Sequence, residues 1–309
     1  LSNESWMEGW VVKLASIDLG SNSTRILIAD VSDEKFDVLE RMHVVTKMSE
    51  NIEQSKEISI EAYKRVDSAL RIFKKLLVKN DVEDVFVVGT AALRDAKNAK
   101  KVIENIRKKY DFEIEVLSGH EEGITTSIGV LHFMKEIENF LIVDIGGRST
   151  EFIYEFENRI ISESLNLGVV TLTEKYFSNL PTSSHLIDEA QFDIENKLSQ
   201  LNIKNSKNVI GVSGTSLSLA SIFLNQQKFN EEELHEIEID IENVQEINNR
   251  LSKMTEAEII TKFSGIDPKR AVTITSGVFL LEQILIRYAN SPIIISKNDI
   301  LEGLILKKY

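Results

Sequence analysis

Two short segments of the chain combine an aspartate, a glycine two positions later and small hydroxyl residues. They are residues 17–24, with the sequence IDLGSNST, and residues 143–150, with the sequence VDIGGRST. Each begins in an apolar, β-branched run that is typical of a buried strand. A turn of this composition can curl its backbone amides around phosphate oxygens. Because the two segments are so alike, they predict a phosphate site between the halves of a duplicated molecule.

A second pair of segments repeats at nearly the same separation. Residues 87–93 read VVGTAAL and residues 212–218 read VSGTSLS, so Gly89 and Gly214 lie 125 positions apart, against 126 for Asp18 and Asp144. Either pair alone could arise by chance, since a strand followed by Gly-Thr is common in α/β proteins. Two pairs at matching separation indicate an internal duplication.

The hydrophobic periodicity around these landmarks predicts the elements that position them. In each half, three apolar strands form a meander around the aspartate loop, and helices and further strands follow. The expected strands are residues 11–17, 25–31, 36–41, 85–88 and 114–117, and then 140–144, 151–156, 159–165, 209–212 and 293–295. The expected helices are residues 60–79 after an N-cap at Ser59, 96–109, 121–134, 271–287 and 300–307, and the acidic stretch 225–262 is helical in pattern. This order predicts an α/β fold with mixed sheets flanked by helices.

Composition narrows the class of protein. The 309 residues favour two domains, and a formal net charge of −13 disfavours a general nucleic-acid surface. We find no apolar run of about 18 to 20 residues for a membrane span and no signal-peptide pattern, so we expect a cytoplasmic protein, with residues 1–9 as a flexible leader. The absence of cysteine excludes disulfides and thiolate catalysis, and the five histidines are too scattered to suggest a metal cluster.

Taken in order, the motifs resemble those of the exopolyphosphatase and guanosine pentaphosphate phosphohydrolase family, which shares the fold of actin, hexokinase and Hsp70. The matching segments cover nearly the whole chain and are residues 17–24, 89–98 (GTAALRDAKN), 118–123 (SGHEEG), 143–151, 167–174 (LGVVTLTE) and 213–215 (SGT). The resemblance implies two duplicated ribonuclease H-like domains, each a mixed sheet flanked by helices, with a cleft between them. We expect a first domain over residues 10–123, closed by the C-terminal helix 299–309, and a second over residues 124–298. At this length the chain resembles the short, two-domain form of the family.

Glu122 is the candidate catalytic base. Hydrolysis of a phosphoanhydride needs a water molecule in line with phosphorus and a carboxylate that orients or deprotonates it. On the residues alone, Glu121 and Glu122 could equally serve to stabilise a helix N-terminus. The resemblance implies that the second of the two glutamates is the base, and its place at the start of an interdomain helix would bring it beside both loops.

Asp18, Asp144 and Glu151 are the candidate ligands of Mg²⁺ or Mn²⁺, because hard divalent cations take oxygen ligands. An aspartate at a strand end often only caps a turn, yet capping does not require the same Asp-x-Gly twice. We expect the metal at the second loop. The phosphate-binding residues are expected to be Gly20, Ser21, Asn22, Ser23, Arg94, Gly146, Gly147, Arg148, Ser149, Thr150, Gly214 and Thr215.

The chain departs from the family pattern in the second loop and near its C-terminal end. Arg148 stands where the family has a third glycine, and arginine cannot cheaply adopt a positive φ. We expect its guanidinium either to clamp phosphate or to fill the pocket and weaken catalysis. Residues 270–274 read RAVTI where the family commonly has Arg-Ala-Asp-x-Ile, and residues 296–303 read SKNDILEG where it has Ser-Asp-x-Gly-Leu-Arg-Glu-Gly.

The motifs and the resemblance together predict a Mg²⁺-dependent phosphohydrolase that releases terminal phosphate from inorganic polyphosphate or guanosine pentaphosphate. One alternative is an ATP-dependent small-molecule kinase of the same fold, which the Glu-Glu segment and the lack of large insertions disfavour. Another is a catalytically weak regulator that binds the nucleotide without turnover, as Arg148 and the C-terminal substitutions suggest. We expect a homodimer, and neither nucleic acid nor membrane as a partner.

Overall fold

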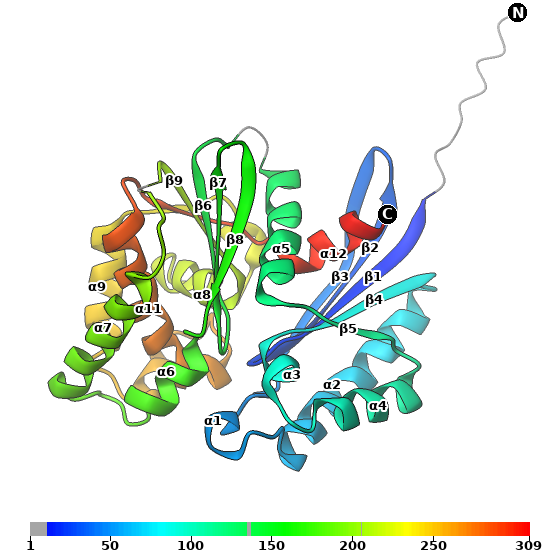
Figure 1. Cartoon of the computed structure of the whole chain (residues 1–309), viewed down its shortest axis with the longest axis horizontal. Coiled ribbons are helices and arrows are strands. Elements are labelled where there is room, and N and C mark those ends of the chain that lie inside the picture. Colours follow the sequence, from blue (N-terminus) through cyan, green and yellow to red (C-terminus); the bar gives the residue numbers. More distant parts are fainter. Residues whose placement is uncertain (1–10, 135–136, 205) are drawn as a thin grey trace, which may run out of the picture.

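Two α/β domains lie side by side in the computed structural model, which describes residues 11–134, 137–204 and 206–309 (Figure 1). The expected leader, residues 1–9, lies outside the described residues. Each domain contains one mixed sheet, and two helices, α5 (Gly119–Phe133) and α12 (Ile300–Lys308), lie between the sheets. The arrangement places the loops at the ends of the central strands against each other.

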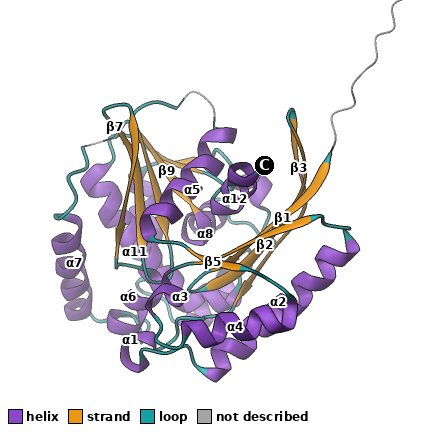
Figure 2. Ribbon diagram, turned by 45° about the vertical axis from the view of Figure 1, so that its right-hand side comes forward, coloured by secondary structure: helices purple, strands orange, loops and turns teal. Residues whose placement is uncertain are grey.

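The first sheet has the strand order β3-β2-β1-β4-β5. Its three leading strands form the expected antiparallel meander, and β4 and β5 run parallel to β1. The strands are β1 (Val12–Leu19), β2 (Ser23–Ser32), β3 (Lys35–Val45), β4 (Asp84–Gly89) and β5 (Ile114–Val116), and the helices are α1 (Ile52–Ser55), α2 (Ile60–Lys79), α3 (Ala91–Asp95) and α4 (Ala99–Tyr110). Figure 2 shows α2 and α4 together on one face of this sheet.

The second sheet repeats this plan and adds one strand, in the order β10-β11-β9-β6-β7-β8. Its strands are β6 (Phe140–Ile145), β7 (Thr150–Phe156), β8 (Arg159–Leu165), β9 (Asn208–Val212), β10 (Glu238–Ile239) and β11 (Ile293–Ile295). Around it lie α6 (Val169–Tyr176), α7 (Ser184–Leu198), α8 (Ser213–Phe223), α9 (Ile241–Leu251), α10 (Glu256–Lys262) and α11 (Ala271–Tyr288), with short 3₁₀ turns at Glu231–Leu234 and Pro268–Arg270.

The duplication extends to the register of the strands. Asp18 in β1 lies opposite Arg25 in β2, and Asp144 in β6 lies opposite Glu151 in β7. Each aspartate also pairs with the last part of a parallel strand, β4 in one domain and β9 in the other. The two aspartates therefore occupy equivalent positions, while their cross-strand partners differ in charge.

The side chains of each central strand alternate between two cores, as the period of two in a strand requires. Ile26 and Ile28 of β2 pack under α2 and α4, whereas Leu27 of β2 packs against Ile300 and Leu304 of α12. On the other side, α5 packs its apolar residues against β6 and β7 of the second sheet. Each interdomain helix therefore covers the inner face of a different sheet.

The two interdomain helices cross at glycine. A Cβ atom at Gly303 of α12 would collide with the carbonyl oxygen of Thr125 in α5, and one at Gly129 of α5 would collide with that of Asp299. Close approach of two helix backbones at a crossing requires residues without side chains. This contact brings the start of α12 next to both domains.

Most of the expected elements are present, with two informative differences. The helix predicted over residues 96–109 begins three residues later, as α4, because Asn98 bonds both the N–H and the C=O of Ile58 and holds an extended turn after α3, a short helix that was not expected. The stretch 225–262 contains a 3₁₀ turn, β10 and two helices instead of a continuous helical pattern. Among the described residues, one segment, Pro268–Tyr288, does have the length and mean hydropathy of a membrane span, contrary to our reading of the sequence, but 78% of its most apolar 18 residues are buried in the protein.

Candidate functional site

A narrow cleft, which we call the central cleft, lies where the two Asp-x-Gly loops meet. Asp18 and Asp144 lie near the ends of β1 and β6, at equivalent positions in the two sheets. Both residues line the central cleft. Residues of both domains and of α5 line it: Asp18, Gly20, Ser21, Asn22, Ser23, Arg25, Thr90, Ala91, Glu122, Asp144, Ile145, Gly146, Gly147, Ser149, Val169, Ser213, Gly214, Thr215, Arg270 and Ile300. Most of the predicted site residues therefore come together.

The two loops are packed directly against each other. A Cβ atom at Gly147 would lie 2.8 Å from the Cβ atom of Ser21 and 3.0 Å from the backbone nitrogen of Asn22. The hydroxyl of Ser21 accepts a hydrogen bond from the backbone N–H of Ala92 at 3.1 Å, which ties the first loop to α3. Gly147 is therefore needed for close approach of the domains, and its φ is not positive.

Glu122 enters the cleft from the first turn of α5. Ser118 caps this helix through a reciprocal capping box with Glu121, so Glu121 has a structural role and Glu122 is left to face the cleft. The Nη1 atom of Arg94 lies 3.3 Å from Oε2 of Glu122 and donates a 2.8 Å hydrogen bond to the carbonyl of Leu117. Burial raises the pKa of Glu122 well above its usual value, and the carboxylates of Glu151, Asp18 and Asp144 raise it further.

The other three carboxylates are buried close enough to influence one another. Burial and the nearby Asp299 carboxylate raise the pKa of Asp144 to about 6. Burial and Asp144 raise the pKa of Glu151 to about 7, although Ser164 donates a 2.7 Å hydrogen bond to its Oε1 atom. Several anions in a dry site repel each other, so a cation or proton would be taken up there.

The carboxylates are suited to a hard cation without forming a complete cage. Within the described part of the chain, Asp18 Oδ1 and Glu151 Oε2 are buried and have no hydrogen-bond partner. No group of three or more His, Asp or Glu side chains among the described residues is close enough to hold a metal ion. Mg²⁺ usually retains waters and takes only one or two carboxylates plus substrate phosphate oxygens, so the donor chemistry fits.

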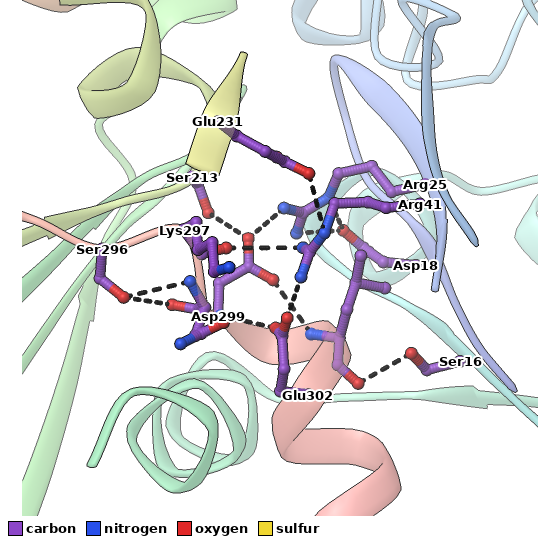
Figure 3. A network of polar contacts seen from close by, with 12 residues as sticks. Ser16, Asp18, Arg25, Arg41, Ser213, Glu231, Ser296, Lys297, Asp299 and Glu302 are labelled. Atoms are coloured by element: carbon purple, nitrogen blue, oxygen red, sulfur yellow. Dashed lines mark hydrogen bonds and ion pairs between the residues drawn. The ribbon is translucent and has the colours of Figure 1, made fainter. Parts of the chain in front are cut away.

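Arg25 and Asp299 are central to the site, although neither stood out in the sequence. Arg25 contacts Asp18 at 2.8 Å and also pairs with Asp299, which precedes α12 (Figure 3). Asp299 in turn accepts a 3.3 Å hydrogen bond from Ser213, whose φ of 61° is a strained, left-handed conformation for serine. The sequence pointed to Ser213, which precedes the Gly214-Thr215 segment of the repeat, and to Asp299 only as part of the segment SKNDILEG.

A second layer of charges lies behind this one. Arg41 of β3 pairs with the buried Glu302 and contacts Glu231 at 3.0 Å (Figure 3). Arg41, Glu231 and the rings of His43 and Phe229 line a cavity of about 550 Å³ that adjoins the central cleft. Arg25, Gly214 and Arg270 line both spaces, so the two are continuous at this point.

Arg270 differs from the other cations around this junction. Its guanidinium lies directly against the backbone of Gly214 and makes no hydrogen bond or ion pair with any residue that the structure describes. Burial and the charge of Arg25 lower the pKa of Arg270 to about 10, and the Asp267 carboxylate opposes this shift only in part. A guanidinium without a direct ion pair at the edge of a cleft attracts anions. In the sequence, Arg270 was noted only as the first residue of the segment RAVTI.

Three predicted phosphate ligands have other partners. The Arg148 side chain is turned away from the cleft and pairs with Glu53 and Asp95 of the first domain, so neither of the two expected roles for its guanidinium is observed. The hydroxyl of Thr150 donates a 2.5 Å hydrogen bond to the carbonyl of Leu167. Arg94 reaches the site through Glu122 and does not line the cleft itself.

The fold is that of the two-domain actin-like class. Its marks are two sheets with the same order of equivalent strands, two crossed helices between the sheets and a cleft where the loops of the two domains meet. Residues 27–309 match the Ppx/GppA phosphatase family, and the chain belongs to that family. The fold and the family expected from the motifs are thereby confirmed.

Several relatives illustrate the relationship. The chain is 30% identical over 311 residues to the bifunctional 3-dehydroquinate synthase/phosphatase of Fusobacterium nucleatum. The aligned region covers 95% of this chain but only 46% of that protein. It is 31% identical over 229 residues to a provisionally named exopolyphosphatase of Haemophilus influenzae, covering 71% of each. The crystal structure of a Cytophaga hutchinsonii exopolyphosphatase is 24% identical, with a TM-score of 0.88 and coverage of 96% and 98% of the two chains.

Proposed function

We propose that this chain is a Mg²⁺-dependent phosphohydrolase that releases terminal phosphate from guanosine pentaphosphate or inorganic polyphosphate. The observation that carries the proposal is the position of Glu122, a buried carboxylate of raised pKa that faces the two Asp-x-Gly loops. Burial and the neighbouring carboxylates make Glu122 a stronger base than a solvated glutamate, which suits it to accept a proton from water. Membership of a phosphatase family agrees with this chemistry.

In the proposed reaction, a water molecule attacks the terminal phosphorus. The water oxygen forms the new P–O bond while the bond to the bridging oxygen breaks, the bridging oxygen leaves with the shortened phosphate chain, and Glu122 accepts the proton of the water. The amides of the Gly20–Ser23 and Gly146–Ser149 segments surround the transferred phosphoryl group, where preorganised dipoles stabilise developing charge. Arg94 holds Glu122 in place at 3.3 Å.

Asp18, Asp144 and Glu151 are the residues that would hold Mg²⁺ or Mn²⁺. A bound divalent cation would neutralise charge on the phosphate oxygens. The buried, unpaired oxygens of Asp18 and Glu151 support this assignment, because each lacks a partner in the described part of the chain. Arg25 competes for Asp18, so we assign the principal ligands to the second loop and β7.

The cavity beside the cleft favours guanosine pentaphosphate over polyphosphate. Its volume of about 550 Å³ falls in the ~300–1,000 Å³ range of small-molecule pockets. Phe229 and His43 offer ring surfaces, and their centroids lie 6.5 Å apart. Arg270, without a carboxylate partner among the described residues, stands between this cavity and the cleft. A polyphosphate chain would need further free cations there, and the other arginines are already paired.

The direct test compares phosphate release from guanosine pentaphosphate and from polyphosphate with Mg²⁺, for the unaltered protein, Glu122→Gln and the matched control Glu121→Gln. Glutamine can still complete the capping box at position 121, so the control keeps the helix intact. We expect Glu122→Gln to lower kcat by about 10²–10⁴-fold. Equal rates for the two variants would remove Glu122 as the base, and acceptor-dependent ADP formation from ATP would instead select the kinase.

We also propose a cytoplasmic location and a homodimer. Neither nucleic acid nor membrane is proposed as a partner, since the net charge of −13 disfavours a nucleic-acid surface and the apolar helix α11 is mostly buried. Sedimentation of the purified protein would test the dimer.

A further inference from the structure

Arg148 joins the two domains across the side of the cleft. It lies in the loop between β6 and β7 of the second domain, and its side chain is 8% exposed. Its Nε atom is 3.1 Å from Asp95 at the end of α3, and its Nη2 atom is 2.6 Å from Glu53 in α1. Both carboxylates belong to the first domain, so the two ion pairs are interdomain contacts.

A neighbouring contact reinforces this side of the molecule. The backbone N–H of Asn51, at the N-cap of α1, donates a 2.8 Å hydrogen bond to Glu174 in α6 of the second domain. Figure 1 shows α1 beneath the second domain, in the region of α6. The short helix α1 therefore touches the second domain at both Asn51 and Glu53.

The ion pairs also connect elements that carry the chemistry. Asp95 directly follows Arg94, the residue that contacts Glu122. On the other side, Arg148 stands between Gly147 and Ser149, which line the central cleft. Glu122 lies in α5 between Gly119 and Gly123, which pack directly against Ser164 and Ser162 of β8 in the second domain. A shift of the second domain away from α3 would therefore separate both the second loop and Glu122 from Arg94.

We propose that Arg148 is a positioning residue that clasps the two domains and holds the second phosphate loop and Glu122 in register with Arg94. The two ion pairs of this clasp can break readily. The side chains of Glu53 and Asp95 are 46% and 37% exposed, and one guanidinium nitrogen, Nη1, is buried without a partner among the described residues. Partly exposed pairs are weak and are screened by salt, so the clasp biases closure without locking it.

The catalytic consequence rests on the proposed function, whereas the conformational consequence does not. If the clasp favours the closed state, its loss lowers the closed fraction, and the apparent substrate affinity falls by that fraction. Chemistry in the closed complex is unchanged. We therefore expect KM to rise about fivefold and kcat to change by less than about twofold when the clasp is removed.

The test measures the distance between the domains directly. Because the chain contains no cysteine, spin labels can be attached at Lys75→Cys in α2 and Gln191→Cys in α7, which are exposed and lie in different domains. Distances between the two labels are measured by electron–electron double resonance. They are compared for the protein with an unaltered clasp, for Arg148→Gly and for the double variant Glu53→Gln with Asp95→Asn. Glu57→Gln, an exposed carboxylate just after α1, is the matched control.

We expect both clasp variants to gain a population at longer distance, the control to match the unaltered protein, and 1 M salt to move the unaltered protein toward the variants. Identical distance distributions in all forms would overturn the inference, whatever the activity. A longer distance with unchanged KM, or a loss in kcat alone, would refute the positioning role. Failure of every form to hydrolyse either substrate would refute the proposed function, and the distances would still decide the clasp.

Discussion

Replacing the carboxylate of Glu151 should stabilise the protein in the absence of metal at alkaline pH. Glu151 is 1% exposed, and burial together with Asp144 raises its pKa from the usual 4.5 to about 7. The fold therefore favours the protonated form. The contribution of this protonation to the free energy of unfolding is complete below pH 4.5 and is lost as the pH rises through about 7.

The magnitude follows from the pKa difference. A difference of about 2.5 units corresponds to about 3 kcal/mol as an upper bound, and about 2 kcal/mol of it is lost between pH 5.5 and pH 8. In a chain of this size that loss lowers the unfolding temperature by about 4 °C. Glu151→Gln keeps an acceptor for Ser164 and has no charge to bury, so its unfolding temperature should vary less with pH.

The assay is calorimetry in EDTA at pH 5.5 and pH 8, followed by addition of Mg²⁺. Glu155→Gln, an exposed carboxylate on the same strand β7, is the control and should follow the unaltered protein. Mg²⁺ should stabilise the unaltered protein at pH 8 more than Glu151→Gln. Parallel pH profiles for the unaltered protein and Glu151→Gln would show that this carboxylate is not strained by its site, and the electrostatic reasoning would fail.

Three further predictions concern the framework and are measured by urea denaturation. Gly303→Ala should destabilise the protein by about 1–3 kcal/mol, because a methyl group there collides with a backbone carbonyl of α5, whereas the exposed Lys307→Ala should be neutral. Ser59→Ala should cost about 1 kcal/mol through loss of the α2 cap, and no change would mean that the cap contributes nothing. Glu302→Ala should cost about 3–5 kcal/mol by removing the fully buried partner of Arg41, which would keep only the partly exposed Glu231, and adding Arg41→Met should recover part of the loss, a recovery that a purely steric effect would not allow.

The sequence predicted the fold well because the fold is repeated. The Asp-x-Gly loop, the strand meander and the Gly-Thr segment each occur once in each half of the chain, so the prediction for one half supported the prediction for the other. The strand β10 was missed, since two residues are too few to show a period. The short helix α3 was also missed, and α4 begins later than expected because Asn98 bonds Ile58, a tertiary contact over 40 positions.

The site was predicted where its residues belong to the repeated loops and missed where they act through distant partners. Arg25 pairs with Asp299 across 274 positions, and no local pattern signals such a contact. Arg148 was recognised as unusual, but the orientation of its side chain could not be predicted, because its partners lie in α1 and α3. Local motifs thus identify the groups that touch phosphate, and the ion pairs that orient them require the fold.

The packing of α12 has a consequence for synthesis of the protein on the ribosome. Leu14, Leu27 and Val88 are made early, yet Ile300 and Leu304 cover them. At about 5–20 residues per second, the roughly 190 residues after β5 take on the order of 10–40 s to translate. Throughout that time the inner face of the first sheet lacks α12, so the nascent chain offers a binding surface to chaperones until α12 emerges.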